Sequence, residues 1–173
     1  MLDRSGFWPA PPNTDTILEG DGLTVRLLPP VPQVMVSGDL KKFLSAHDLG
    51  PTAGLLGQVA PPRYALRLAR HRMLAVGIPQ DHASAGWADG VATTPMTGAL
   101  AVLDISGENG MALIARATAI DPRSDSPSAA LTFAGVQAAL CRQGNDLRLH
   151  VDRGLVSFLF DWIRVTSPGG STH

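Results

Sequence analysis

A weak internal repeat constrains the fold of this chain more than any other feature of its sequence. Val34-Met-Val-Ser-Gly-Asp39 is followed by Leu-Lys-Lys-Phe-Leu-Ser-Ala, and Leu103-Asp-Ile-Ser-Gly-Glu108 is followed by Asn-Gly-Met-Ala-Leu-Ile-Ala. In both copies an apolar run stops at a Ser-Gly pair and an acidic residue precedes a helical pattern. A polar oxygen there caps the first free amides of a helix, and a carboxylate favours the helix N-terminus. Each copy therefore predicts a strand, a Ser-Gly turn and a helix.

Each predicted helix is followed by the pattern of a β-hairpin. In the first copy, residues 63–69 alternate apolar with polar or small side chains, and residues 73–78 follow a short Arg-His turn. In the second copy, residues 131–133 and 136–141 lead through Gln-Gly-Asn-Asp to residues 147–151. Alternation with a period of two is typical of half-buried strands, so two hairpins are predicted.

A closing helix is expected after each hairpin. The weaker pattern covers residues 80–88. In the stronger pattern Asp152 is a candidate N-cap, and five apolar residues recur at the spacing of one helical face: Leu155, Phe158, Leu159, Trp162 and Ile163.

Two β-α-β-β-α units in tandem predict an α+β fold in which antiparallel sheets are covered by helices, as in a duplicated ferredoxin-like sandwich. We expect a single domain over residues 23–166, with two pseudo-repeats at about 33–88 and 96–164. Residues 1–22 are rich in Pro, Asp and Gly and are expected to form an extended leader, and residues 167–173 a flexible tail.

The charge balance excludes whole classes of partner. With 14 Lys+Arg against 15 Asp+Glu, the formal net charge is -1, so no overall basic field is present to hold nucleic acid or an anionic membrane. We expect no signal peptide, and no apolar run has the roughly 18 residues of a membrane-spanning helix. The single cysteine, Cys141, can form no internal disulfide. A cytoplasmic protein is the expectation.

No catalytic or metal-binding residue is predicted. The five histidines are scattered, and none forms the i, i+3 or i, i+4 pair of a helical metal site. His150 shares a strand face with Asp152, which could orient a general base, but without a nucleophile elbow we interpret this face as solvated. Cys141 alternates with Ala139 and Gln137 and has no activating base beside it, so we expect a packed, inert thiol.

Arg63, Tyr64 and Arg72 are the candidate cofactor-binding residues. A deep pocket lined by any of them would favour a ligand-binding protein, whereas an apolar surface without a pocket would favour a subunit. Trp8, in the leader, is a candidate anchor to a partner or to the body of the protein. A local basic hairpin could hold a carboxylate or an acidic partner, or be merely solvated; it carries Arg63, Arg67, Arg70, His71 and Arg72.

Several segments in a fixed order, from about Trp87 to Ile163, carry a family resemblance. They are residues 91–107, residues 115–122, residues 132–142, residues 147–153 and a helix that ends in Asp161-Trp162-Ile163. In this order and spacing they resemble the gamma subunit of heterotetrameric sarcosine oxidase. That family is related to the glycine-cleavage aminomethyltransferase (T-protein) and its folate-binding superfamily.

The resemblance implies an aminomethyltransferase-like fold and a non-catalytic role beside larger flavoprotein subunits that oxidise a methylamine such as sarcosine. It also implies that flavin and tetrahydrofolate belong to those partners, with no cofactor bound by this chain alone. The aminomethyltransferases carry an acidic residue on the strand after a Gly-rich hairpin, but here the stretch reads Gly135-Val-Gln-Ala-Ala139. The Lys-Gly-Cys motif of the related iron-sulfur repair proteins is also absent, so folate chemistry does not carry over.

Two functions stay open on the sequence. One is a small gamma-type subunit of a sarcosine-oxidase-like flavoenzyme in folate-linked one-carbon metabolism, and the other is a free-standing folate-type ligand-binding protein without catalytic activity. The expected partners are larger flavoprotein oxidase subunits or further copies of the chain. An independent hydrolase is disfavoured, because no nucleophile, base and orienting group come together in the motifs.

Overall fold

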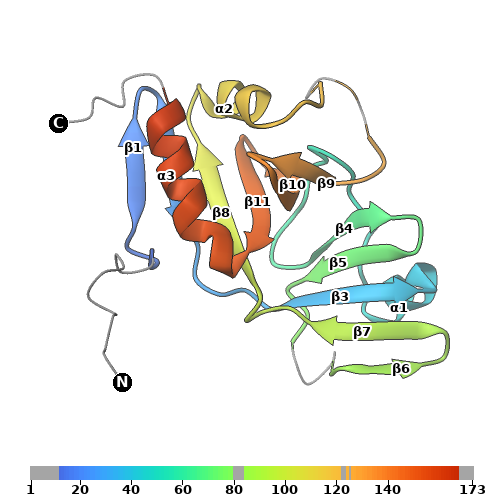
Figure 1. The fold of residues 1–173 in the computed structure, drawn as a ribbon. Coiled ribbons are helices and arrows are strands. Elements are labelled where there is room, and N and C mark those ends of the chain that lie inside the picture. The colour runs from blue at the N-terminus through green and yellow to red at the C-terminus, as the bar shows by residue number, and fades with distance from the viewer. Residues whose placement is uncertain (1–11, 80–83, 122–123, 125, 168–173) are drawn as a thin grey trace, which may run out of the picture.

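The computed structural model describes residues 12–79, 84–121, 124 and 126–167, whose strands form two antiparallel sheets (Figure 1). Sheet A has six strands in the order β1-β2-β8-β11-β10-β9: β1 (Ile17–Gly20), β2 (Leu23–Leu27), β8 (Leu100–Ser106), β9 (Ala130–Phe133), β10 (Val136–Gln143) and β11 (Asp146–Asp152). Sheet B has five in the order β4-β5-β3-β7-β6: β3 (Gln33–Gly38), β4 (Tyr64–Ala69), β5 (Arg72–Val76), β6 (Gly86–Ala88) and β7 (Val91–Pro95). The helices are α1 (Leu40–Ala46), α2 (Gly110–Ala117) and α3 (Val156–Thr166). The expected α+β class with antiparallel sheets is confirmed.

The two sheets share one plan. In sheet B, β4, β5 and β3 lie side by side, as β10, β11 and β8 do in sheet A, and the β6–β7 hairpin takes the place of the β1–β2 hairpin. In each half the strand next to that hairpin, β3 or β8, leads directly into a helix, α1 or α2. The extra hairpin precedes this strand in sheet A and follows it in sheet B. Because of this difference in chain order, the extra hairpin is not part of the repeat that is visible in the sequence.

The Ser-Gly turn of the repeat lets the chain pass close to the neighbouring hairpin. Gly38 and Gly107 have φ values of 106° and 102°, which side chains rarely adopt. A Cβ on Gly38 would collide with the carbonyl oxygen of Gly90, and a Cβ on Gly107 with that of Gly22. Because Gly90 and Gly22 belong to the turns of the β6–β7 and β1–β2 hairpins, the same contact occurs in both halves.

The caps of the two repeat helices differ. The Asp39 carboxylate accepts a hydrogen bond from the amide of Lys42 at 3.1 Å and so caps α1. In the second copy the N-cap position belongs to Asn109 rather than Glu108, and no side-chain hydrogen bond caps α2. The expected capping side chain is confirmed for the first copy only.

Alternating side chains give each sheet two apolar faces. One face of sheet A packs against α2 and α3, in a core that includes Leu103, Leu140, Leu149, Ile114, Leu159 and Phe160. One face of sheet B packs against α1, through Val34, Val36, Leu40, Phe43 and Met73. The opposite faces share a third cluster that includes Tyr64, Leu66, Leu74, Ala139 and Cys141. The layers therefore run helix, sheet, sheet, helix, and α3 covers the outer face of sheet A (Figure 1).

The connection from α1 to β4 ties the two sheets together through backbone hydrogen bonds. The amide of Ala53 donates to the carbonyl of Ala65 in β4 at 2.8 Å, and the amide of Arg67 donates to the carbonyl of Ala53 at 2.8 Å. Further along, the amide of Val59 donates to the carbonyl of Arg142 in β10 at 2.8 Å. The relative position of the sheets therefore rests on main-chain bonds as well as on side-chain packing.

The prediction of a closing helix over residues 80–88 is wrong for residues 84–88, the part of this segment that the structure describes. Residues 80–83 lie outside the described residues, and Gly86–Ala88 is strand β6. Asp89 and Gly90 have φ values of 54° and 81°, as in a type I′ hairpin turn, for which Asp-Gly is a preferred sequence. The first half, from β3 to β7, therefore reads β-α-β-β-β-β, and the second, from β8 to α3 with β9 added before its hairpin, reads β-α-β-β-β-α.

The closing helix of the second unit is confirmed, but its buried face differs from the predicted one. Residues Arg153–Leu155 form a 3₁₀ turn, which the Asp152 carboxylate caps by accepting from the amide of Gly154 at 2.7 Å. The helix then begins at Val156, and its buried residues are Val156, Leu159, Phe160 and Ile163. Leu155 and Phe158, expected on the buried face, are 36% and 47% exposed.

The end of the leader expected over residues 1–22 belongs to the folded body, because Ile17–Gly20 is the edge strand β1 of sheet A. Trp8 lies outside the described residues, as does the tail expected over residues 167–173 apart from Ser167, the C-cap of α3. Within the described part of the chain, no helix has both the length and the apolar character needed to cross a membrane.

Candidate functional site

Three polar side chains form a hydrogen-bonded chain between the two sheets. Gln33 opens β3, Tyr64 opens β4 and His150 lies on β11, so both sheets contribute. The Tyr64 hydroxyl lies 3.1 Å from Nε2 of His150, and Nδ1 of His150 lies 2.7 Å from Oε1 of Gln33. The Gln33 amide nitrogen donates to the carbonyl of Leu100 at 3.3 Å. All three side chains are buried, with exposed fractions of 1% for Gln33, 7% for Tyr64 and 2% for His150.

In the hydrogen bonds among these three side chains, Tyr64 donates to His150 and His150 donates to Gln33. The amide oxygen of Gln33 can only accept, so Nδ1 of His150 carries the imidazole proton and donates it. Nε2 then accepts from the hydroxyl of Tyr64. The imidazole is therefore neutral, and both of its nitrogens are engaged.

Burial keeps these groups neutral across the physiological pH range. It lowers the pKa of His150 from 6.5 to about 3, an effect to which the nearby charge of Arg148 adds. Burial also raises the pKa of the Tyr64 hydroxyl above its ordinary value. Neither group titrates near neutral pH, and the hydrogen bond between them links the two sheets. The interpretation of His150 as part of a solvated strand face is wrong.

A pocket of about 310 Å³ opens beside the hydrogen-bonded side chains of Gln33, His150 and Tyr64, between the two sheets. Strands β3, β4 and β5 line it from sheet B, and β8, β9, β10 and β11 from sheet A. His150 contributes to its lining, with Arg72 of β5 and Gln137 of β10. The larger apolar side chains around it are Met35, Leu68, Leu74 and Leu100. We call it the inter-sheet pocket.

The structure does not bring the three candidate cofactor-binding residues together. Arg72 is exposed and lines the inter-sheet pocket. Tyr64 is buried and its hydroxyl is engaged in the hydrogen-bonded chain. Arg63 is exposed and directly precedes Tyr64, which pairs with Val76 at the open end of the β4–β5 hairpin. Arg72 pairs with Ala69 at the turn of the same hairpin. The two arginines therefore lie at opposite ends of the β4–β5 hairpin.

Gln33 and Gln137 are site residues that the sequence reasoning missed. The signal for Gln33 was a polar side chain directly before the apolar run of a predicted strand. For His150 the signal was its position between Leu149 and Val151 in a strand of apolar alternation. Neither signal identifies a partner, because the hydrogen bond between Gln33 and His150 joins residues 117 positions apart.

Cys141 is a packed thiol, as expected. It is fully buried, and its Sγ lies 3.8 Å from the carbonyl oxygen of Arg148. Burial raises its pKa to about 12, against the lowering effect of Arg148. The Arg148 Nε lies 3.4 Å from Oδ1 of Asp104, and burial raises the pKa of that carboxyl despite this partner. Among the described residues, no group of three or more His, Cys, Asp or Glu is placed to hold a metal ion.

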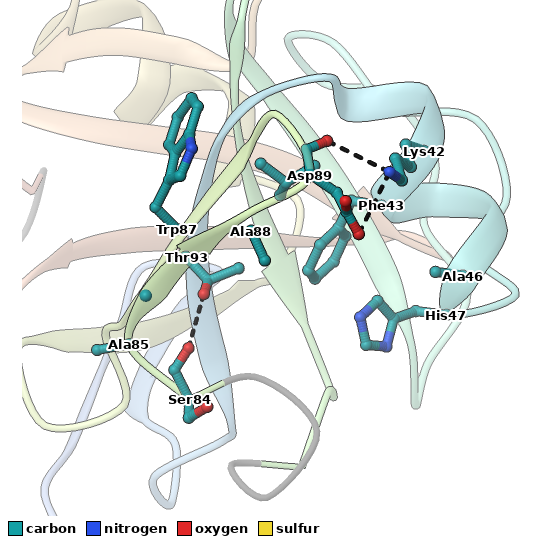
Figure 2. Close-up of a pocket in the computed structure, with 12 residues that line it drawn as sticks. Lys42, Phe43, Ala46, His47, Ser84, Ala85, Trp87, Ala88, Asp89 and Thr93 are labelled. Atoms are coloured by element: carbon teal, nitrogen blue, oxygen red, sulfur yellow. Dashed lines mark hydrogen bonds and ion pairs between the residues drawn. The ribbon is translucent and has the colours of Figure 1, made fainter.

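A second hollow, of about 370 Å³, lies between α1 and the β6–β7 hairpin, and Figure 2 shows its lining. Nζ of Lys42 lies 3.5 Å from the carboxylate of Asp89 and 3.3 Å from its carbonyl oxygen. The rings of Phe43 and His47 pack with their centroids 4.2 Å apart. Trp87 is 70% exposed, and its indole is directed away from Lys42 (Figure 2). In this α1-hairpin groove, Lys42 and Asp89 neutralise each other.

Comparison with known proteins gives a match through structure. No family model matches the chain, and no curated protein matches it. Among 14 matching chains of solved structures is one from the heterotetrameric sarcosine oxidase of Corynebacterium sp. U-96, in complex with pyrrole 2-carboxylate. The TM-score is 0.67 at 15% sequence identity, over 90% of this chain and 91% of that chain. The chain has the fold of a sarcosine oxidase subunit.

Proposed function

We propose that this chain is a small, non-catalytic gamma-type subunit of a sarcosine-oxidase-like heteromeric flavoenzyme, which demethylates a methylated glycine in folate-linked one-carbon metabolism. The observation that carries the proposal is the mutual coverage of the structural match, 90% of this chain and 91% of the other. A match of this kind pairs one whole chain with another, and not with one domain of a much larger protein. The matched chain comes from a heterotetrameric enzyme, which supports a role in an assembly.

The chemistry of the buried side chains supports a non-catalytic role. His150 and Tyr64 engage each other, and burial moves the pKa of each away from neutrality. The buried thiol of Cys141 is held in its protonated form by a pKa of about 12. An activated nucleophile needs a lowered pKa or an adjacent base. Cys141 has neither, and the base beside the Tyr64 hydroxyl, Nε2 of His150, is weak because burial lowers the pKa of His150 to about 3. In this proposal the flavin and tetrahydrofolate belong to the larger subunits.

The surface supports a partner. Several large apolar side chains remain exposed among the described residues: Ile17, Trp87, Ile120, Leu155, Phe158 and Val165. Aromatic side chains such as Trp87 and Phe158 are enriched at the centres of protein interfaces. Permanent interfaces commonly bury on the order of 2,000 Å² or more, so such side chains are expected to lie against the larger flavoprotein subunits in a cytoplasmic complex.

A free-standing folate-type ligand-binding protein is the second candidate, and the inter-sheet pocket is the observation that favours it. The pocket lies between the two halves of the chain and is lined by Arg72, one of the three candidate residues. Arg63 and Tyr64 do not line it. Its volume of about 310 Å³ is near the lower end of the roughly 300–1,000 Å³ typical of ligand sites.

Co-purification distinguishes the two candidates. The tagged chain is co-expressed with any flavoprotein oxidase subunits encoded beside its gene, and the eluate is tested for those subunits and for flavin absorbance. The subunit proposal predicts that both are retained through the tag. Loss of the subunits, together with tight binding of tetrahydrofolate by the lone chain in calorimetry, would reject it in favour of the ligand-binding protein.

A further inference from the structure

The inter-sheet pocket carries a single kind of charge. Of the described residues that line it, Arg72 has the one charged side chain, and no Asp or Glu is among them. His150 adds no charge, because its Nε2 accepts from Tyr64 and its Nδ1 donates to Gln33. The electrostatic environment of the pocket therefore favours an anion over a cation.

Arg72 is free to bind a ligand. Among the described residues its guanidinium makes no hydrogen bond and no ion pair, and it is exposed at the start of β5. By contrast, Arg67 of the same hairpin donates to the hydroxyl of Thr52 at 3.1 Å and to the carbonyl of Arg70 at 3.0 Å. Lys42, the cation of the α1-hairpin groove, is paired with Asp89 (Figure 2). Of these three cations, Arg72 is the one that lines the inter-sheet pocket, and none of its guanidinium donors is used by the described residues.

The rest of the pocket suits an apolar ligand body. Met35 and Leu74 line it from sheet B, and Leu100 from sheet A. Ala130 and Ala139, which pair across β9 and β10, leave space because their side chains are small. The volume of about 310 Å³ is at the small end of ligand sites, so a small ligand fits best.

Gln137 supplies a second polar contact. Its amide nitrogen donates to the hydroxyl of Thr132 at 3.1 Å, a bond that orients the side chain on β10. The amide oxygen and the second N–H are left for a ligand. Because Arg72 stands on sheet B and Gln137 on sheet A, a ligand that reaches both would bridge the two sheets.

We propose that the inter-sheet pocket binds a small organic monocarboxylate with an apolar body, whose carboxylate pairs with Arg72. The planar guanidinium matches a carboxylate with two parallel hydrogen bonds, and a single arginine beside apolar walls suits one such group better than a dianionic phosphate. This site goes beyond the subunit assignment and does not depend on it. Since both sheets form the pocket, the ligand binds the folded state and not the unfolded state, and so raises the unfolding temperature of the chain.

The test uses hexanoate and benzoate as probes, with hexanamide and benzamide as uncharged counterparts of the same shape. Binding to the full chain is followed by amide chemical shifts in NMR titrations and by thermal unfolding. Arg72→Gln removes the proposed ion pair, and Arg63→Gln is the matched control, an exposed arginine at the other end of the same hairpin. Ala130→Leu fills the pocket while it retains Arg72.

The expected result is saturable binding of a carboxylate that moves the amides of β5 and β10 and raises the unfolding temperature. Hexanamide and benzamide should bind about tenfold or more weakly than the carboxylates, the scale of a lost charge-assisted pair. Arg72→Gln and Ala130→Leu should each weaken carboxylate binding to the same extent, and Arg63→Gln should not. Three results would each overturn the proposal: hexanamide and benzamide bind as tightly as the carboxylates, the two arginine substitutions have equal effects, or neither carboxylate saturates the chain. Binding of tetrahydrofolate without either carboxylate would also overturn it, in favour of a folate-type site.

Discussion

The hydroxyl of Tyr64 lies 3.1 Å from Nε2 of His150, and this bond links sheet B to sheet A across 86 positions of sequence. Both residues are buried, and the other nitrogen of the imidazole is hydrogen-bonded to Gln33. Buried polar groups cost free energy unless they are paired, so the contact favours one relative placement of the two sheets over alternatives that would leave these atoms without partners.

Tyr64→Phe should destabilise the chain by about 1–3 kcal/mol, because it leaves Nε2 of His150 buried without a donor. Urea unfolding followed by circular dichroism measures the loss. The control is the same substitution in a His150→Leu background, where the acceptor is already gone and removal of the hydroxyl should be neutral or stabilising. An equal loss in both backgrounds would show that the bond between the two residues contributes nothing.

Stability should fall as the pH is lowered from about 6.5 towards 3. The pKa of His150 is about 3 in the folded chain against an ordinary 6.5, so between these values the unfolded chain binds one more proton. The slope from this group approaches 1.4 kcal/mol per pH unit, and its contribution is complete above about pH 6.5. The raised pKa of Asp104 acts in the opposite direction. Urea unfolding at several pH values measures the sum of these effects.

His150→Gln isolates the histidine contribution, because Gln can replace both hydrogen bonds and does not titrate. The pH dependence of wild type minus that of the variant should show the slope between pH 3 and 6.5. His71→Gln, at an exposed position in the β4–β5 turn, serves as the matched control for the substitution itself. The assignment fails if His150→Gln and wild type lose stability in parallel on acidification.

Gly38→Ala and Gly107→Ala should each cost about 2 kcal/mol or more. Each adds a Cβ at a φ beyond 100° and drives it into the carbonyl oxygen of Gly90 or Gly22. Gly86→Ala, whose Cβ would meet nothing within 4 Å, is the control in the β6–β7 hairpin and should change stability far less. Thermal unfolding compares the three, and equal shifts in unfolding temperature would contradict the close approach.

The thiol of Cys141 should resist modification in the folded chain. It is fully buried, and burial raises its pKa to about 12, so the reactive thiolate is scarce at pH 8. Because it is the single cysteine, the absorbance released from an aromatic disulfide reagent reports it directly. We expect rapid, complete reaction in urea and negligible reaction over the same time without it. Rapid reaction of the native chain would place the thiol at the surface.

The sequence predicted the strands and hairpins of the fold well where side chains alternate. Leu147, Leu149 and Val151 of the predicted strand all face the helical core, because a period of two specifies one buried face. The Asp-Gly pair at Asp89 and Gly90 held the signal for the β6–β7 hairpin, and the helical interpretation of residues 80–88 ignored it. Local turn chemistry outweighed a weak helical period at this point.

The candidate site was harder to predict because it depends on how the two sheets meet. The polar face of β11 was expected to be solvated, but its His150 faces a second sheet and is buried. A single strand pattern cannot reveal what covers its other face. Arg72 was named from the sequence and does line the inter-sheet pocket, whereas Gln33 and Gln137 gain their roles only from contacts across the fold.

Native mass spectrometry of the complex purified through a tag on this chain tests the central claim most directly. The chain is co-expressed with any flavoprotein oxidase subunits encoded beside it, and the eluate is sprayed from a volatile buffer near neutral pH. The account predicts a heteromer that contains this chain together with the larger subunits and their flavin. A spectrum with only the chain itself, as a monomer or as copies of itself, would contradict the subunit assignment.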